Sequence, residues 1–223
     1  MTKRLYLHVG APKSGTTYLQ AILEGNTKAL ASKGVLVVAA ERRLERVHAA
    51  MAIREDSRLA KLPPEAALAW DRLVAEIKAW PGDSAVCSYE LFAAASAEKV
   101  ERALAKLDGI EVHVVITAPD QARAMPSAWQ ERLQFALTEP LVSFAPDKTM
   151  GARAQWGWRT MDPAGVARRW GGSLPPRQVH IVTMPKQPAS QHEFWERFAD
   201  ACAIDSEGLD LDQVKVNESM GVV

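Results

Sequence analysis

The stretch from Gly10 to Thr17, GAPKSGTT, combines residue types that can bind a phosphate group. A short apolar run, RLYLHV, leads into it, and a helical pattern starts near Gly15, so the stretch is a turn between a strand and a helix. Such a turn leaves backbone N–H groups without intrahelical partners, and the helix dipole adds partial positive charge there. Thr16 and Thr17 add hydroxyl donors. We therefore predict a phosphate-binding loop; the alternative is an ordinary strand–helix turn with a surface lysine.

The position of the lysine suggests which chemistry the loop serves. In nucleoside triphosphatases the lysine directly follows the second glycine, and the hydroxyl beside it holds magnesium. Here Thr16 occupies that position, and the lysine is Lys13, inside the loop and next to Pro12. A lysine beside the bound phosphate can neutralise charge that develops on a bridging oxygen. The pattern favours metal-free transfer of a group from a single 5′ phosphate, and a kinase-like enzyme is the less favoured alternative.

The segment HVGAPKSGTTYLQ resembles the phosphosulfate-binding loop of the sulfotransferases that use 3′-phosphoadenosine 5′-phosphosulfate (PAPS), and PSAWQE, residues 126–131, resembles the bacterial, particularly actinobacterial, members of that family. The resemblance extends from residue 4 to about residue 221 and implies a P-loop-like sulfotransferase fold with PAPS as co-substrate and no metal. It also implies that Lys13 contacts the bridging oxygen. The implied 5′-phosphate site consists of Pro12, Lys13, Ser14, Gly15, Thr16 and Thr17.

A second family signature binds the 3′ phosphate through an arginine and a serine eight residues later. Ser127 matches the serine, but Pro119 stands in place of the arginine and brings neither charge nor an N–H donor. The loss of such a contact costs on the order of 1.5–3 kcal/mol. Arg123, which we expect in the first turn of the following helix, is either a replacement or a solvated arginine. A sulfotransferase-like protein that binds a nucleotide or a partner without catalysis is therefore the alternative function.

Sulfuryl transfer needs a proton acceptor near the acceptor hydroxyl. Within the family this group is a histidine or a glutamate. Glu90 stands at the end of an apolar strand, so we predict it as the general base; the alternative is a glutamate that only stabilises a helix N-terminus. His8, in the strand that leads into the loop, is the reserve candidate, and its alternative is a buried histidine with satisfied hydrogen bonds.

Strands and helices alternate along the chain, and the strands are continuous apolar runs. This pattern predicts an α/β fold, a parallel central sheet with helices on both faces, in one domain over residues 1–223. The predicted strands are 4–10, 35–39, 84–90, 110–118 and 177–184. The predicted helices are 15–34, 41–53, 64–79, 97–109, 120–137, 163–172 and 190–204. Ligands of such folds bind beyond the carboxyl ends of the strands.

The composition excludes several classes of partner. The 27 basic and 27 acidic residues balance, so no overall field attracts nucleic acid or an anionic membrane surface. No apolar run is long enough to span a membrane and no signal peptide is evident, so we expect a cytoplasmic protein. Cys87 and Cys202 are expected to be buried free thiols.

The sequence leaves the acceptor open among small molecules, sugars and lipids. Four arginines are either solvated or able to bind an anionic acceptor, and the sequence does not decide between these interpretations: Arg153, Arg159, Arg168 and Arg169. Family members continue beyond the Asn-Glu-Ser stretch with further helices, so the chain ending at Val223 is expected to be a short or a truncated member.

Overall fold

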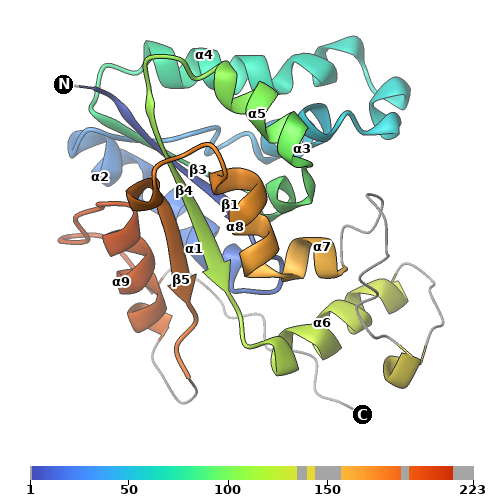
Figure 1. Cartoon of the computed structure of the whole chain (residues 1–223). Coiled ribbons are helices and arrows are strands. Elements are labelled where there is room, and N and C mark those ends of the chain that lie inside the picture. Colours follow the sequence, from blue (N-terminus) through green and yellow to red (C-terminus); the bar gives the residue numbers. More distant parts are fainter. Residues whose placement is uncertain (1, 135–139, 144–156, 187–190, 213–223) are drawn as a thin grey trace.

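A five-stranded sheet forms the centre of the computed structural model, which describes residues 2–134, 140–143, 157–186 and 191–212. The strands are β1 (Arg4–Gly10), β2 (Val35–Val37), β3 (Ser84–Ser88), β4 (Glu111–Ala118) and β5 (Val179–Thr183). Their order is β2-β3-β1-β4-β5, and every neighbouring pair is parallel (Figure 1). The predicted α/β fold with a parallel sheet is confirmed.

Helices cover both faces of this sheet. Within the described residues the α-helices of the chain are α1 (Thr16–Gly25), α2 (Thr27–Ser32), α3 (Arg43–Arg54), α4 (Ala69–Ala79), α5 (Ala97–Ala105), α6 (Gln121–Gln134), α7 (Trp158–Met161), α8 (Pro163–Gly171) and α9 (Gln191–Ala201). Helices α3, α4, α5 and α8 bury their apolar sides against one face. Helices α1, α2 and α9 pack against the other (Figure 1).

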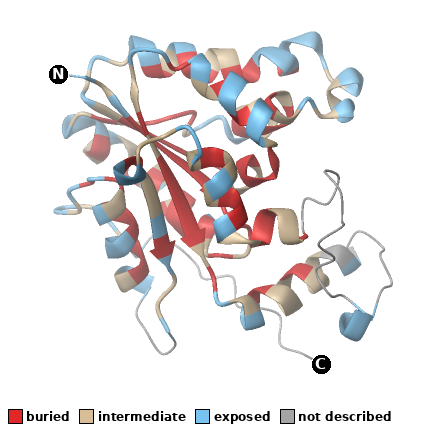
Figure 2. Ribbon diagram, viewed as in Figure 1, coloured by how far each residue is buried: buried red, intermediate tan, exposed pale blue. Residues whose placement is uncertain are grey.

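The central strand β1 shows why the sheet forms a core on both sides. Leu5 and Leu7 belong to the cluster under α3, α4, α5 and α8, whereas Tyr6 between them belongs to the cluster under α1 and α9. A strand that is buried on both faces reads as a continuous apolar run, because successive side chains point to opposite sides. Figure 2 shows the buried residues concentrated in the sheet and on the inner sides of the helices.

Asn26 divides the single helix predicted for residues 15–34 into α1 and α2, so that prediction is wrong. The buried side-chain amide donates to the carbonyl oxygens of Ile22 (2.9 Å) and Asp210 (2.8 Å) and accepts from the N–H of Asp210 (2.8 Å). A buried asparagine bound to the backbone competes with helix continuation. The periodicity of the sequence contains no sign of this distant contact.

Other boundaries differ by small amounts. The helix predicted for 64–79 begins as a 3-10 turn, Pro64–Leu68, before α4, and the strand predicted for 35–39 ends at Val37. Helix α6 continues through Pro126. Cys87 and Cys202 are buried and unpaired, as predicted. Among the helices in the described ranges, none has the length and apolar character needed to cross a bilayer.

We predict that Asn26→Ala lowers the free energy of unfolding by about 1–3 kcal/mol, because it removes hydrogen bonds of a buried amide and leaves backbone groups near Asp210 without their partner. Denaturant unfolding followed by circular dichroism measures the change. Ser32→Ala, which removes one exposed hydroxyl contact within α2, is the control. Equal stability of the two variants would contradict this account of the helix break.

Candidate functional site

The predicted phosphate loop connects β1 to α1 at the carboxyl end of the central strand. The N–H of Ala11 donates to the carbonyl oxygen of Thr117 on β4 (2.9 Å), which fixes the start of the loop to the neighbouring strand. Gly10 lies close to the segment after β3, since a Cβ there would be 2.9 Å from the carbonyl oxygen of Glu90. The loop is thus held between the ends of two adjacent strands.

The residues at the end of the loop explain how α1 begins. Gly15 precedes the helix with a φ of 72°, and a Cβ at this position would lie 2.7 Å from a ring carbon of Phe194. Glycine is required here both for the left-handed conformation and for the close approach of α9. The first turn of α1 contains no acidic residue, and it places Thr16 inside and Thr17 at the surface. The helix N-terminus therefore keeps its positive potential.

Lys13 forms an ion pair with Glu131 on α6, a residue that sequence analysis did not select. Lys13 Nζ lies 2.7 Å from Glu131 Oε2, and each side chain is 24% exposed. Lys13 has a φ of 61°, in the left-handed region that non-glycine residues seldom adopt. Such strain is often found at functional sites. The ion pair brings α6 next to the phosphate loop.

The predicted 3′-phosphate residues lie on this same helix. Arg123, Ser127 and Glu131 are spaced by four residues and therefore occupy one side of α6. Ser127, one turn before Glu131, is partly exposed, and Arg123 is exposed in the first turn. Pro119 is buried between β4 and α6.

Asp120 caps the start of α6. Its carboxylate accepts from the N–H of Ala122 at 2.9 Å. The helix N-terminus nearest to Pro119 therefore already has a negatively charged partner.

Glu90 begins a 3-10 turn, η3 (Glu90–Ala94), which is separated from the end of β3 by one residue, and its side chain is only partly buried. The side-chain amide of Gln20 on α1 donates to Glu90 Oε2 at 3.1 Å. The backbone of the predicted base thus lies next to Gly10 at the start of the loop, and its carboxylate is bound by the helix that follows the loop.

Two of the four arginines whose role the sequence left open bind the backbone of η3. Arg169 donates to the carbonyl oxygens of Ala95 (3.0 Å) and Ala93 (2.9 Å), and Arg159 donates to that of Ala94 (2.8 Å). Burial lowers the pKa of Arg169 to about 10, so it remains charged at neutral pH. Trp170 adds an indole N–H bond to the carbonyl oxygen of Phe92 at 3.0 Å.

Arg168 is mostly exposed, with Asp162 3.6 Å away, and Arg153 lies outside the described residues.

His8, the reserve base, is fully buried under α9, where its ring meets Phe198 edge-on at 5.2 Å. Its Nδ1 lies 2.7 Å from Ser88 Oγ and its Nε2 lies 3.1 Å from Thr117 Oγ1. Burial lowers the pKa of His8 to about 3, so the ring is neutral. Of the two predicted bases, Glu90 has the exposure that a base for an external hydroxyl needs.

Sequence analysis missed four residues of this region: Gln20, Ser88, Thr117 and Glu131. Ser88 and Thr117 carried a usable signal, because each is a polar residue at the carboxyl end of an apolar strand. Gln20 follows Thr16 by one helical turn, on the buried side of α1. For Glu131 the only signal in the sequence was its four-residue spacing from Ser127. That spacing could be interpreted only after the ion pair between Glu131 and Lys13 was known.

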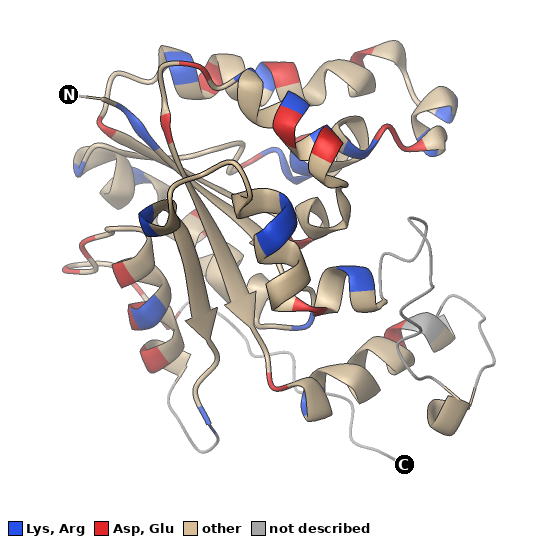
Figure 3. Cartoon of the chain, viewed as in Figure 1, with Lys and Arg blue, Asp and Glu red and all other residues tan. Residues whose placement is uncertain are grey.

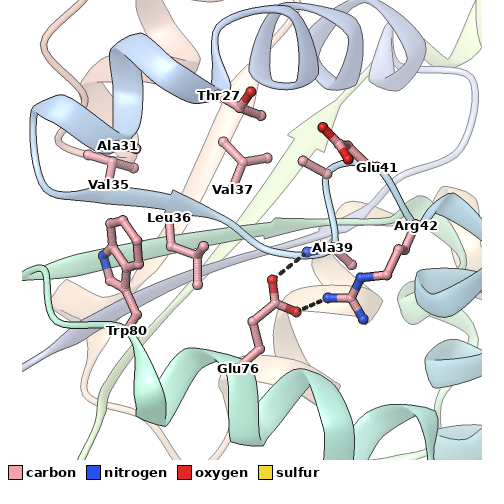
Figure 4. Close-up of a pocket in the computed structure, with 11 residues that line it drawn as sticks. Thr27, Ala31, Val35, Leu36, Val37, Ala39, Glu41, Arg42, Glu76 and Trp80 are labelled. Carbon is pink, nitrogen blue, oxygen red and sulfur yellow. Dashed lines mark hydrogen bonds and ion pairs between the residues drawn. The ribbon is translucent and has the colours of Figure 1, made fainter.

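A cavity of about 290 Å³ lies elsewhere, beside the edge strand β2 (Figure 4). Glu76 in its wall accepts from the N–H of Ala39 (3.2 Å) and pairs with Arg42. None of the predicted site residues lines this cavity.

In the view of Figure 3, basic and acidic residues lie close to one another along α4, α5 and α9. In the described part of the chain, no group of three or more His, Cys, Asp or Glu side chains could hold a metal ion.

Comparisons with known proteins identify the fold. No protein-family profile and no curated protein matches the sequence. A solved sulfotransferase from Alicyclobacillus acidocaldarius superimposes with a TM-score of 0.62 at 12% identity, over 97% of this chain and 88% of that chain. The sulfotransferase domain from the curacin biosynthetic pathway gives a TM-score of 0.51 at 14% identity, over 96% of this chain and 79% of that chain. At these identities the likeness establishes a sulfotransferase fold.

We predict that Gly15→Ala destabilises the protein more than Gly109→Ala, by about 1–3 kcal/mol in the free energy of unfolding. Both glycines have positive φ, 72° and 81°, so both substitutions introduce the same kind of backbone strain. Only at position 15 does the new methyl group meet a buried ring, that of Phe194. Chemical denaturation of the two variants isolates this contact, and equal losses would argue against it.

The burial of His8 predicts a pH dependence of stability. Its pKa falls from 6.5 to about 3 on folding, so between these values the unfolded chain binds more protons. Stability from this group is complete above pH 6.5 and declines as pH falls toward 3. In this pH window we expect the free energy of unfolding to depend less on pH for His8→Gln than for the wild type. The difference in slope corresponds to the uptake of up to one proton on unfolding. Unfolding titrations at several pH values measure both slopes, and parallel curves would exclude a buried neutral His8.

Proposed function

We propose that the protein is a sulfotransferase that moves the sulfuryl group of PAPS to an acceptor hydroxyl. The observation that carries the proposal is the Pro-Lys-Ser-Gly-Thr-Thr loop, which joins the central strand to α1 within a sulfotransferase fold. Lys13 on this loop and Glu90 at the end of the adjacent strand supply the two charges that the reaction needs, with opposite signs.

The 5′ side of the donor fits the residues present. The backbone N–H groups that start α1 and the hydroxyls of Thr16 and Thr17 supply donors for phosphate oxygens. No carboxylate in the first turn of α1 opposes an anion. Lys13 supplies the positive charge, and the negatively charged donor competes with Glu131 for it.

The proposed step is an in-line displacement at sulfur. The acceptor oxygen forms a bond to sulfur as Glu90 takes the hydroxyl proton. The bond between sulfur and the bridging oxygen of the 5′ phosphate breaks, and its electron pair leaves with 3′,5′-ADP. Lys13 and the loop N–H groups stabilise the charge that develops on this leaving group. The products are the sulfate ester and 3′,5′-ADP.

The 3′ side of the donor favours a second candidate function. Pro119 supplies no charge, and Asp120 places a carboxylate on the adjacent helix start. Arg123 and Ser127 are the residues that we assign to the 3′ phosphate. If they bind it weakly, the protein is a sulfotransferase-fold nucleotide- or partner-binding protein with impaired catalysis.

Calorimetric titration separates these functions. We expect 3′,5′-ADP to bind more tightly than ATP with magnesium, because the loop is suited to a single 5′ phosphate. Binding without transfer would support the impaired protein, and a preference for ATP with magnesium would support a kinase-like enzyme. If neither nucleotide binds, the proposal is wrong.

Lys13→Ala should reduce sulfuryl transfer about 100-fold or more, because it removes the charge that faces the leaving group. Transfer is measured with radiolabelled PAPS against a panel of phenols, sugars and lipid alcohols, which also identifies the acceptor class. Lys33→Ala, which removes a lysine paired with Asp205 far from the loop in sequence, is the control. A Lys13→Ala variant with the turnover of the wild type would exclude the role given to Lys13.

A further inference from the structure

A chain of hydrogen bonds runs from the phosphate loop to Glu90 beneath the candidate site. It starts at Ser14 on the loop, which contacts Thr117 Oγ1 and donates to the carbonyl oxygen of Ala11. Thr117 meets Nε2 of His8, and Nδ1 of His8 meets Ser88.

Gln20 completes the chain. Its side-chain amide nitrogen lies 3.4 Å from Ser88 Oγ and 3.1 Å from Glu90 Oε2. The side chains of His8, Ser14, Thr117 and Ser88 are at most 2% exposed. Bulk water therefore does not compete for the bonds among these four residues.

The chemistry of the groups sets the direction of each bond. A carbonyl oxygen only accepts, so the single hydroxyl hydrogen of Ser14 goes to Ala11, and Ser14 accepts from Thr117. Thr117 has then used its hydrogen and accepts from His8 Nε2–H.

The other half of the chain follows in the same way. Nδ1 of His8 carries no proton and accepts from the hydroxyl of Ser88. Ser88 in turn accepts from Gln20, whose second amide hydrogen reaches the carboxylate of Glu90. With His8 as the neutral Nε2–H tautomer, every one of these side-chain bonds is satisfied at once; the ring also has a hydrogen-bond contact with the backbone of Gly10.

We propose that His8 is a positioning residue, which in this tautomer couples the geometry of the phosphate loop to that of Glu90. The inference rests on the proposed function, because it assigns the loop to the donor and Glu90 to the acceptor. His8 lies on the central strand, and its two ring nitrogens reach the strands on either side, so one rigid ring fixes β3 and β4 to each other.

A protonated His8 would break this coupling. With a hydrogen on both nitrogens, the ring would donate to Ser88 as well as to Thr117. Ser88 would then face two donors, His8 and Gln20, and its own hydrogen would lose its acceptor. The burial that lowers the pKa of His8 to about 3 prevents this protonation.

Three substitutions test the coupling from different ends. Thr117→Val interrupts the loop side and should raise the dissociation constant of 3′,5′-ADP about tenfold. Gln20→Leu interrupts the Glu90 side and should slow the turnover of bound donor about tenfold with little change in binding. His8→Phe keeps a ring but removes both bonds, so it should show both effects. Calorimetry gives the binding constants, and sulfate release from radiolabelled PAPS with water as acceptor gives the turnover.

A control and a rescue variant separate positioning from stability. Val100→Ala, which removes methyl groups that α5 buries in the core, should lower stability without changing the dissociation constant of 3′,5′-ADP or the turnover of donor. His8→Gln, which retains an amide donor in the region of Nε2, should recover part of the donor affinity that His8→Phe loses. If His8→Phe behaves like Val100→Ala, His8 is only structural and the inference is wrong.

Nitrogen NMR of the imidazole tests the tautomer without any ligand. We expect a protonated Nε2 and a bare Nδ1 at neutral pH, and the opposite tautomer or a charged ring would overturn the inference. A wild type that binds no 3′,5′-ADP refutes the proposed function and the role of His8 together. A wild type that binds and turns over donor, with His8→Phe unchanged in both, refutes this inference alone.

Discussion

The arrangement of the candidate site depends on the pairing of β1 with both β3 and β4. Because all three strands are parallel, their carboxyl ends meet at one edge of the sheet. Two backbone bonds continue the pairing there, from Tyr89 N–H to the carbonyl oxygen of His8 (3.1 Å) and from Ala11 N–H to that of Thr117 (2.9 Å). The phosphate loop and the segment with Glu90 therefore start from fixed and adjacent points.

Burial of polar groups at this edge constrains which residues can stand there. A buried hydroxyl or imidazole without a hydrogen-bond partner costs about 1–3 kcal/mol of stability. Each such group at this edge therefore needs a neighbouring polar group as its partner. Ser88, Thr117 and His8 satisfy one another on the side of α1 and α9. On the opposite side of the sheet, Arg169 and Arg159 bind the carbonyl oxygens of η3. The base candidate is therefore supported from both layers of helices.

The two halves of the proposed donor site differ in how they are built. The 5′ side is local, because the loop and the start of α1 are contiguous in the chain. The 3′ side depends on α6, which the Lys13–Glu131 pair holds against the loop. That pair is partly exposed, with both side chains 24% accessible. Under the proposed function, an anionic donor would compete with Glu131 for Lys13, whereas the loop would bind it through backbone N–H groups.

The sequence by itself determined the α/β class, most of the helices and strands, and the loop from Gly10 to Thr17, since these follow from periodicity, glycines and local spacing. It did not show the break at Asn26, whose partner, Asp210, is distant in the chain. Only the tertiary structure paired Lys13 with Glu131 and linked His8 to Ser88 and Thr117. These contacts join residues roughly 80 to 120 positions apart, and such proximity arises from strand order and helix packing, which local sequence does not encode.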